Sequence, residues 1–290
     1  MVAGYNRRSA YQIMRKRQAA SATRREIYEA ERRRRSLAVA AASTAVVVLA
    51  LIVLVPLAPG WEKVQKSFFN GAVLAKSFPR LLDAFKVNVM IFAWSAPSIA
   101  ILGLLIALAR GVRAPTLFPL RIFATIYTDV FRGVPVILTV YLIGFGIPGL
   151  GLPRPWNSPY IWGSVALVLT YSAYVAEIFR SGIDSVHHSQ RSAALSLGLS
   201  EGQAMRDVIL PQAVRNVVPS QMNMLIALQK DVSLLSFIGP VEIFRQAGVF
   251  KSLLANFTPY VGAAIIFLAV TIPATRYADY LMAKQTRERR

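Results

Sequence analysis

The sequence "SLAVAAASTAVVVLALIVLVPLAPG", residues 36–60, contains no charged side chain. A helix that spans a bilayer needs roughly 20 predominantly apolar residues, so this run is long enough to cross a membrane once. A cleaved signal peptide is the competing interpretation, but the charged region before the run is far too long and "VPLAPG" is a poor cleavage site. We therefore predict a retained transmembrane helix over residues 37–57.

The segments around this run extend the pattern. Residues 1–36 form a basic arm with 11 Lys and Arg against three Glu, and the tail 284–290 is also basic. Residues 58–85 mix Lys with aromatic side chains, as an external amphipathic segment does. Five further apolar runs predict spans at about 86–109, 119–147, 160–180, 216–238 and 259–281. The sequence therefore predicts an all-α polytopic membrane protein with six transmembrane helices.

The distribution of Lys and Arg predicts the orientation of these helices. With the N-terminus inside, the cytoplasmic segments hold 23 of these residues and the external segments hold 7. Short loops rich in Lys and Arg stay on the cytoplasmic side. We therefore expect both termini, and also the polar stretch 192–214, to be cytoplasmic.

The charge and the residue types exclude several classes of function. The net charge of +19 does not indicate nucleic-acid binding, because the basic residues are spread over every inner loop without an aromatic-interleaved module. Anionic lipid headgroups are the expected partner of the basic arm. The chain has no Cys, and its two His, His187 and His188, are adjacent and point about 100° apart on a helix. We predict no metal site.

Several spans contain charged or polar side chains at depths where a lipid-facing helix avoids them. Asp129 and Arg132 share one helical face, and Gly133 and Pro135 interrupt the helix directly after them. Two interpretations stay open: Asp129/Arg132 and Lys230/Asp231 are structural ion pairs within the bundle, or broken helices line a transport route. The residues assigned to this route or its gate are Asp129, Arg132, Gly133, Pro135, Glu177, Arg180, Lys230, Asp231 and Ser233.

The sequence lacks its own means of using nucleotide energy. It contains no "GK" dipeptide, so it has no loop that could cradle the phosphates of a nucleotide, and no nucleophile–base pattern stands out. We expect a transporter subunit that is not an enzyme and binds no cofactor. Uphill transport would then need an ion gradient or a separate ATPase.

The polar stretch "SAALSLGLSEGQAMRDVILPQAV", residues 192–214, predicts two short helices. The first would end at Gly198, where a left-handed residue commonly terminates a helix. Ser200 and Gln203 form a capping box for the second, and Glu201 suits its positive end. Such a segment is too polar and too short to span a bilayer, and we expect it to lie at the cytoplasmic face and to project toward a partner protein.

The second helix is expected to run to about Leu210, just before Pro211, with an apolar strip made of Leu199, Met205 and Val208. The spacing of this stretch resembles the EAA motif of ABC-importer permeases, which reads E-A-A, three residues, G, nine residues and I-x-L-P. Ala193, Ala194, Gly198, Leu210 and Pro211 match it, Val208 replaces the Ile, and Ser192 replaces the Glu. The missing carboxylate puts an ionic contact at that point in question, so docking would rely on shape and apolar contact.

Four more blocks, "VFRGVPVIL" (130–138), "YSAYVAEIFRSGI" (171–183), "LQKDVSLLSFIG" (228–239) and "VEIFRQAG" (241–248), resemble the polar amino-acid uptake branch of that family in order and spacing. The resemblance implies a five-helix permease core at 86–283, an extra N-terminal helix, and coupling helices at about 190–211 between helices four and five. The coupling residues would be Ser192, Ala193, Ala194, Gly198, Leu199, Ser200, Glu201, Met205, Val208, Leu210 and Pro211.

The resemblance also implies the partners. They are two ABC ATPase subunits that hold ATP and Mg, a second permease copy or a sister permease, and an extracytoplasmic amino-acid-binding protein, all at a bacterial cytoplasmic membrane. Glutamate is the favoured substrate, since Arg or Lys in the path suits an additional carboxylate, and glutamine, aspartate or a basic amino acid stay open. A self-contained ion-coupled transporter and a membrane scaffold protein are the alternative functions.

Overall fold

The structure is a computed structural model. It describes the backbone of residues 7–112 and 114–288, and the side chains of residues 28, 29, 31–112 and 114–284. Every regular element of the described residues is a helix. The chain divides into two compact units, Met1–Gln65 and Lys66–Arg290.

The first unit is built on one long helix. Helix α1 (Arg7–Leu54) has 48 residues, so the predicted basic arm and the predicted first span belong to a single helix. The apolar side chains of its second half, such as Leu49, Leu51 and Ile52, are exposed. An apolar helix that is exposed all round is what a lipid-facing span looks like when no bilayer is drawn. The short helix α2 (Trp61–Phe68) follows.

The second unit begins with a helix longer than the sequence pattern indicates. Helix α3 (Gly71–Gly111) starts after Asn70, whose side-chain oxygen accepts the N–H groups of Ala72 and Val73. It therefore covers part of the segment expected outside the membrane as well as the second predicted span. At 1.5 Å per residue it is about 60 Å long, twice the thickness of a hydrocarbon core.

The third predicted span is broken. A short 3-10 turn (Pro115–Leu117) leads into α4 (Phe118–Gly133), which ends at the glycine, and α5 (Val136–Gly146) starts directly after the proline. The two helices are bent by 106°. The prediction that Gly133 and Pro135 interrupt this span is confirmed, and a second 3-10 turn (Pro148–Leu150) follows.

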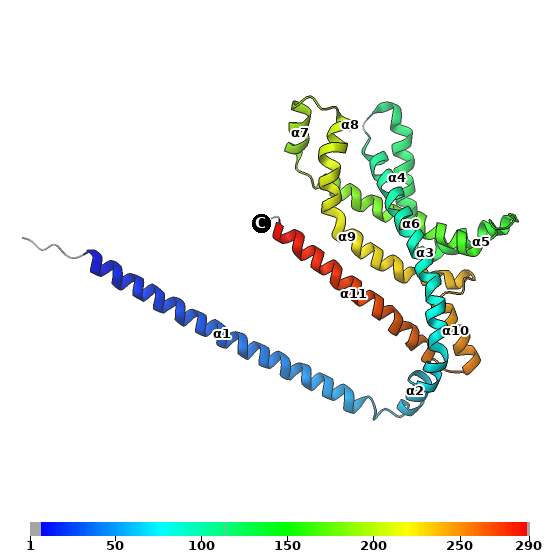
Figure 1. The fold of residues 1–290 in the computed structure, drawn as a ribbon, viewed down its shortest axis with the longest axis horizontal. Helices are drawn as coiled ribbons and strands as arrows, with labels where there is room; N and C mark the ends of the chain where they lie inside the picture. Colours follow the sequence, from blue (N-terminus) through cyan, green and yellow to red (C-terminus); the bar gives the residue numbers. More distant parts are fainter. Residues whose placement is uncertain (1–6, 113, 289–290) are drawn as a thin grey trace, which may run out of the picture. The chain divides into compact units, whose positions relative to one another are not determined.

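Helix α6 (Pro159–Asp184) is the centre of the second unit and contacts α3, α4, α5 and α9 (Figure 1). Small residues allow these close crossings. A Cβ atom added at Gly182 would collide with Val217 of α9, and one added at Gly103 of α3 would collide with Val175. The main apolar core lies around α6 and takes side chains from α3, α4, α5 and α9.

The chain after α6 forms one long, irregular path. It comprises α7 (His188–Ser196), α8 (Glu201–Gln203), a π-helical turn η3 (Ala204–Ile209), α9 (Leu210–Asp231), a 3-10 helix η4 (Val232–Ile238), α10 (Ile243–Leu254) and α11 (Thr258–Glu288). Helix α11 packs against α3, α9 and α10 (Figure 1). The stretch from Glu201 to Ile238 and helix α10 are bent by 51°.

Four helices in the described part of the chain are long and apolar enough to cross a membrane, at Glu31–Leu54, Trp61–Gly111, Pro159–Asp184 and Thr258–Lys284. The count reaches six when each of the two bent pairs is taken as one span. The all-helical membrane architecture is thus confirmed, and the number of spans is four to six.

Candidate functional site

The most connected ionic group of the second unit is Glu177 in α6. Its Oε2 atom lies 2.8 Å from Nη1 of Arg110 at the end of α3, and 3.6 Å from Nη1 of Arg132 at the end of α4. Its Oε1 atom accepts from Arg180, one turn later, whose Nε lies 3.0 Å away. Arg180 also pairs with Asp184 at 2.7 Å. One carboxylate therefore joins three helices.

The charges of this cluster do not cancel. Three guanidinium groups face the two carboxylates of Glu177 and Asp184, which leaves one positive charge in excess. Arg132 is the least engaged of the three, since its only ion pair, to Glu177, is the longest, whereas Arg110 makes a short ion pair and Arg180 pairs with both carboxylates. It is the group best placed to take another anion.

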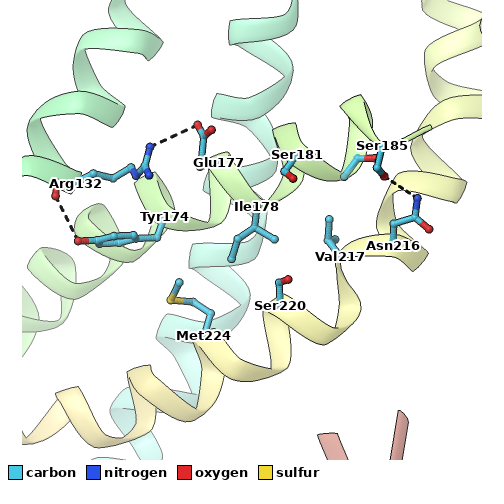
Figure 2. A pocket seen from close by; sticks show the side chains of 11 residues that line it. Arg132, Tyr174, Glu177, Ile178, Ser181, Ser185, Asn216, Val217, Ser220 and Met224 are labelled. Atoms are coloured by element: carbon cyan, nitrogen blue, oxygen red, sulfur yellow. Dashed lines mark hydrogen bonds and ion pairs between the residues drawn. The ribbon is translucent and has the colours of Figure 1, made fainter. Parts of the chain in front are cut away.

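A cavity of about 470 Å³ opens beside this cluster, between α4, α6 and α9. Figure 2 shows that the side chains of α6 and α9 face each other across it. Hydroxyl and amide groups supply most of its polar lining, and Arg132 and Glu177 lie at one end. Its lining residues are Arg132, Tyr174, Glu177, Ile178, Ser181, Gly182, Ser185, Asn216, Val217, Ser220 and Met224.

Two hydrogen bonds fix the ends of the cavity (Figure 2). The Tyr174 hydroxyl donates to the backbone carbonyl of Arg132 at 3.4 Å, and Nδ2 of Asn216 donates to Oγ of Ser185 at 2.9 Å. The first bond ties the C-terminal end of α4 to α6, and the second ties α6 to α9. The cavity is thus framed by polar links between three helices.

The structure does not form the ion pair considered for Asp129 and Arg132. Arg132 reaches across to Glu177 of α6 (Figure 2), and Asp129 is exposed, with no ion-pair partner among the described residues. Arg180, expected on the route by sequence, contacts Glu177 from the same helix. Arg110 is the member of the cluster that the sequence analysis does not predict, because it directly follows the apolar run 86–109 and nothing local distinguishes it from an ordinary charged helix end.

Lys230, Asp231 and Ser233 lie elsewhere. The Tyr171 hydroxyl donates to Asp231 at 2.7 Å, and Asn88 donates to Ser233 at 3.4 Å. Lys230 is exposed and has no ion-pair partner among the described residues. The pair considered between Lys230 and Asp231 does not form, since Asp231 accepts from Tyr171 and the Lys230 side chain is exposed. None of the three lines the cavity beside Arg132.

A fully buried carboxylate, Glu242, was not singled out by the sequence. It caps α10 by accepting the N–H groups of Phe244 at 3.0 Å and Arg245 at 2.8 Å, and it accepts from Nδ2 of Asn88 at 3.1 Å. The oxygen of Asn88 in turn accepts the N–H of Ile243 at 3.1 Å. Asn88 and Glu242 together satisfy the first three N–H groups of α10.

The stretch 192–214 begins as its local signals predict. Helix α7 ends at Ser196, and Gly198 adopts a φ of +84°. The Ser200 side chain accepts the N–H of Gln203 at 3.3 Å, and the Gln203 side chain accepts the N–H of Ser200 at 2.8 Å. The predicted capping box is confirmed.

The predicted end of the second helix near Leu210 is wrong. The helix runs through Pro211 and continues to Asp231 as α9. A π turn at Ala204–Ile209 makes this possible, because the N–H of Leu210 bonds to the carbonyl of Met205, five residues back. A wider turn relieves the clash that a proline ring makes with the carbonyl four residues earlier.

A small separate core supports this turn. Val186, Ile209 and Ala213 are buried together, and Met205 and Val208 pack against them. Two of the three residues in the expected apolar strip therefore face inward, toward the ends of α6 and α9. Ala194 is also buried, whereas Ser192, Ala193, Gly198 and Ser200 are exposed.

Comparison with protein families gives the identity of this fold. Residues 67–287 match the family described as "Binding-protein-dependent transport system inner membrane component". The chain belongs to this family. The match begins after α1, so the long N-terminal helix lies outside it.

The relatives with recorded roles are permeases. The chain is 35% identical to the "Probable amino-acid permease protein YxeN" of Bacillus subtilis, over 69% of this chain and 88% of that protein. It is 33% identical to the "Probable glutamine ABC transporter permease protein GlnM" of the same organism, over 73% and 96%. It is also 33% identical to the "Arginine transport system permease protein ArtQ", over 68% and 88%.

Solved structures agree with this assignment. A crystal structure of an amino acid ABC transporter with histidines superposes with a TM-score of 0.67 at 30% identity, over 74% of this chain and 98% of that one. The inward-facing MetNI methionine ABC transporter superposes with a TM-score of 0.57 at 15% identity, which supports the fold alone. The predicted family, and the prediction of a non-enzymatic permease subunit of the inner membrane, are confirmed.

Proposed function

We propose that this chain is the transmembrane permease subunit of an ATP-driven importer for a polar amino acid. The family and the names of the relatives support an amino-acid importer. The proposed assembly contains two ABC ATPase subunits that bind ATP and Mg²⁺, a second copy of this chain or a sister permease, and an extracytoplasmic binding protein. Both termini and the stretch 192–214 face the cytoplasm, as the Lys and Arg distribution favours.

One observation carries this proposal: a single continuous helical path connects the EAA-like segment to the cavity. The path starts at Glu201, passes through the π turn, and continues as α9, whose Asn216 and Ser220 line the cavity. A displacement of the segment by an ATPase therefore moves one wall of the cavity directly. This is the mechanical link that alternating access between two rigid bodies requires.

The cavity is the proposed route for the amino acid. Its volume of about 470 Å³ leaves room for an amino acid with some water, and Arg132 is available to a carboxylate. A guanidinium group holds a carboxylate through charge-assisted hydrogen bonds. The excess positive charge of the cluster favours glutamate over a basic amino acid.

Uptake by reconstituted protein tests the proposal. We expect proteoliposomes that contain this chain and its ATPase to accumulate labelled glutamate only with ATP and the binding protein. Competition by unlabelled glutamine, aspartate and arginine ranks the substrates. Uptake by the chain alone under an ion gradient would instead identify an ion-coupled transporter, which the relatives do not favour.

A further inference from the structure

The segment 187–211, which contains α7, α8 and the π turn, has as many positive as negative side chains. It contains four charged residues, which form two ion pairs. Arg191 donates to Oε2 of Glu201 from Nε at 3.0 Å and from Nη2 at 2.5 Å, and Arg206 donates to Asp207 from Nε at 2.7 Å. No charge of this segment is left without an opposite charge inside the segment. A partner that recognised it by charge would find no net charge to recognise.

The Arg191–Glu201 pair has a different geometry from the Arg206–Asp207 pair. Arg206 and Asp207 are sequence neighbours, whereas Arg191 in α7 and Glu201 in α8 are ten residues apart. The Arg191–Glu201 pair therefore closes the turn between α7 and α8. Two N–H groups of Arg191 donate to the same oxygen of Glu201, and these charge-assisted hydrogen bonds hold α7 against the start of α8.

The turn that this pair closes carries an exposed leucine. Leu197 is 84% exposed at the tip, directly before the left-handed Gly198. Ala194 before the turn and Ala204 after it are buried, and the N–H of Leu199 bonds back to the carbonyl of Ala194 at 3.2 Å. The turn that carries Leu197 is thus fixed by a backbone hydrogen bond, by the packing of two buried alanines and by one ion pair.

We propose that the Arg191–Glu201 ion pair is a positioning element that presents Leu197 to an apolar pocket on the ATPase subunit. The inference rests on the proposed function, since it takes the ATPase as the partner of this segment. Ser192, at the position of the motif's Glu, offers no charge, and the other charges are compensated. Docking therefore depends on burial of apolar surface at Leu197, and the ion pair remains at the rim, where it does not have to be desolvated.

Titration of the purified ATPase subunit onto the solubilised permease tests this inference. We expect Leu197→Asp to weaken binding about tenfold or more, because a carboxylate would have to enter the apolar pocket. Leu197→Met, of similar volume, should bind nearly as the unchanged protein does. Binding of the unchanged protein should depend little on salt, since few uncompensated charges meet.

Charge reversal tests the ion pair separately. Arg191→Glu and Glu201→Arg should each weaken ATPase binding about fivefold through like-charge repulsion, and the double reversal should restore it. The matched control is Asp83→Asn, which breaks the exposed Asp83–Lys86 pair of α3 and should leave binding unchanged. Equal affinity in both single reversals and the unchanged protein would overturn the positioning role.

Failure of the proposed function and failure of the inference about Leu197 give different results. If the unchanged permease gives no ATP-dependent uptake with any ATPase, the proposed function fails. If it transports normally while Leu197→Asp binds and transports equally well, only the present inference fails. A strong loss of ATPase binding in high salt would also contradict it, because that result requires an ionic interface.

Discussion

At the scale of single residues, Arg110 and Arg132 contact the same Glu177 oxygen in different settings. Arg110 is mostly buried and makes a short ion pair, whereas Arg132 is half-exposed and makes a long one beside the cavity. Loss of a buried partner leaves a charge without compensation, which is costly. We therefore expect the first arginine to support the fold, and we propose the second as the one that contacts the substrate.

Arg132→Gln should lower the rate of glutamate uptake about tenfold, because one charge-assisted contact to the substrate carboxylate is lost. The thermal unfolding temperature in detergent should stay nearly constant. Uptake into proteoliposomes and thermal unfolding measure the two effects. Lys230→Gln is the matched control, since Lys230 is exposed and lies outside the cavity. Unchanged uptake in Arg132→Gln would remove this residue from the route.

Glu177→Gln should act on stability instead. The substitution leaves Arg110, Arg132 and Arg180 without their common carboxylate. We expect the free energy of unfolding to fall by about 1.5–3 kcal/mol, the usual contribution of hydrogen bonds to a charged group. A lower unfolding temperature than that of Arg132→Gln, measured in the same detergent, would bear this out, and equal temperatures would contradict it.

At the scale of elements, the ends of the helices are where local sequence signals succeed or fail. The turn at Gly198 and the cap at Ser200 were predicted because each depends on residues a few positions apart. The continuation through Pro211 was not, because a proline ordinarily ends a helix and no sequence rule announces a π turn. Apolar length predicted the spans for the same local reason, and Gly133 and Pro135 predicted the break in the third span, but no local signal predicted its bend of 106°.

Substitutions at Gly198 test whether the left-handed turn after α7 is needed for coupling. A residue other than Gly in the left-handed conformation costs about 1–2 kcal/mol, and Asn tolerates it best. Gly198→Val should therefore reduce ATP-dependent uptake strongly while the protein still reaches the membrane, and Gly198→Asn should retain most uptake. Pro211→Leu should also uncouple transport, because without the proline ring the wide π turn is no longer needed and the helix can rewind. Uptake and membrane abundance are measured together, and equal uptake in all variants would exclude a coupling role.

The N-terminal cap of α10 gives a second prediction about a single helix. Asn88→Ala removes the acceptor of the Ile243 N–H, and Glu242→Ala removes the acceptors of Phe244 and Arg245. Each loss of a cap should destabilise the start of α10 by about 1 kcal/mol. Faster amide hydrogen exchange at these residues, and not in α11, is the expected result. Uniformly faster exchange throughout the second unit would show a global effect instead.

At the scale of the whole molecule, the chain combines a permease fold with an added N-terminal unit. The family match covers 67–287, which corresponds to the second compact unit. Sequence reasoning found the family because the motif blocks are contiguous. It missed the Arg110–Glu177 and Asn88–Glu242 contacts because their members are 67 and 154 residues apart, and nothing local marks such a pair.

Deletion of residues 1–30 separates the permease from the scaffold alternative. We expect ATP-dependent uptake to persist, since the matched family region remains complete. Attraction to anionic lipid should fall, because 7 of the 11 basic residues of the arm are removed. Uptake and flotation with vesicles of anionic or neutral lipid measure these effects. Complete loss of uptake with normal membrane abundance would favour the scaffold.

The close crossing of α6 and α9 has a mechanical consequence. Gly182 allows α6 to touch α9 at Ala213 and Val217, near the middle of the helical path from Glu201 to Asp231. Under the proposed function, we expect this close contact to transmit a displacement of the Glu201 end from α9 to α6, the two helices that face each other across the cavity. A larger side chain at Gly182 would collide with Val217, push the two helices apart and weaken that transmission.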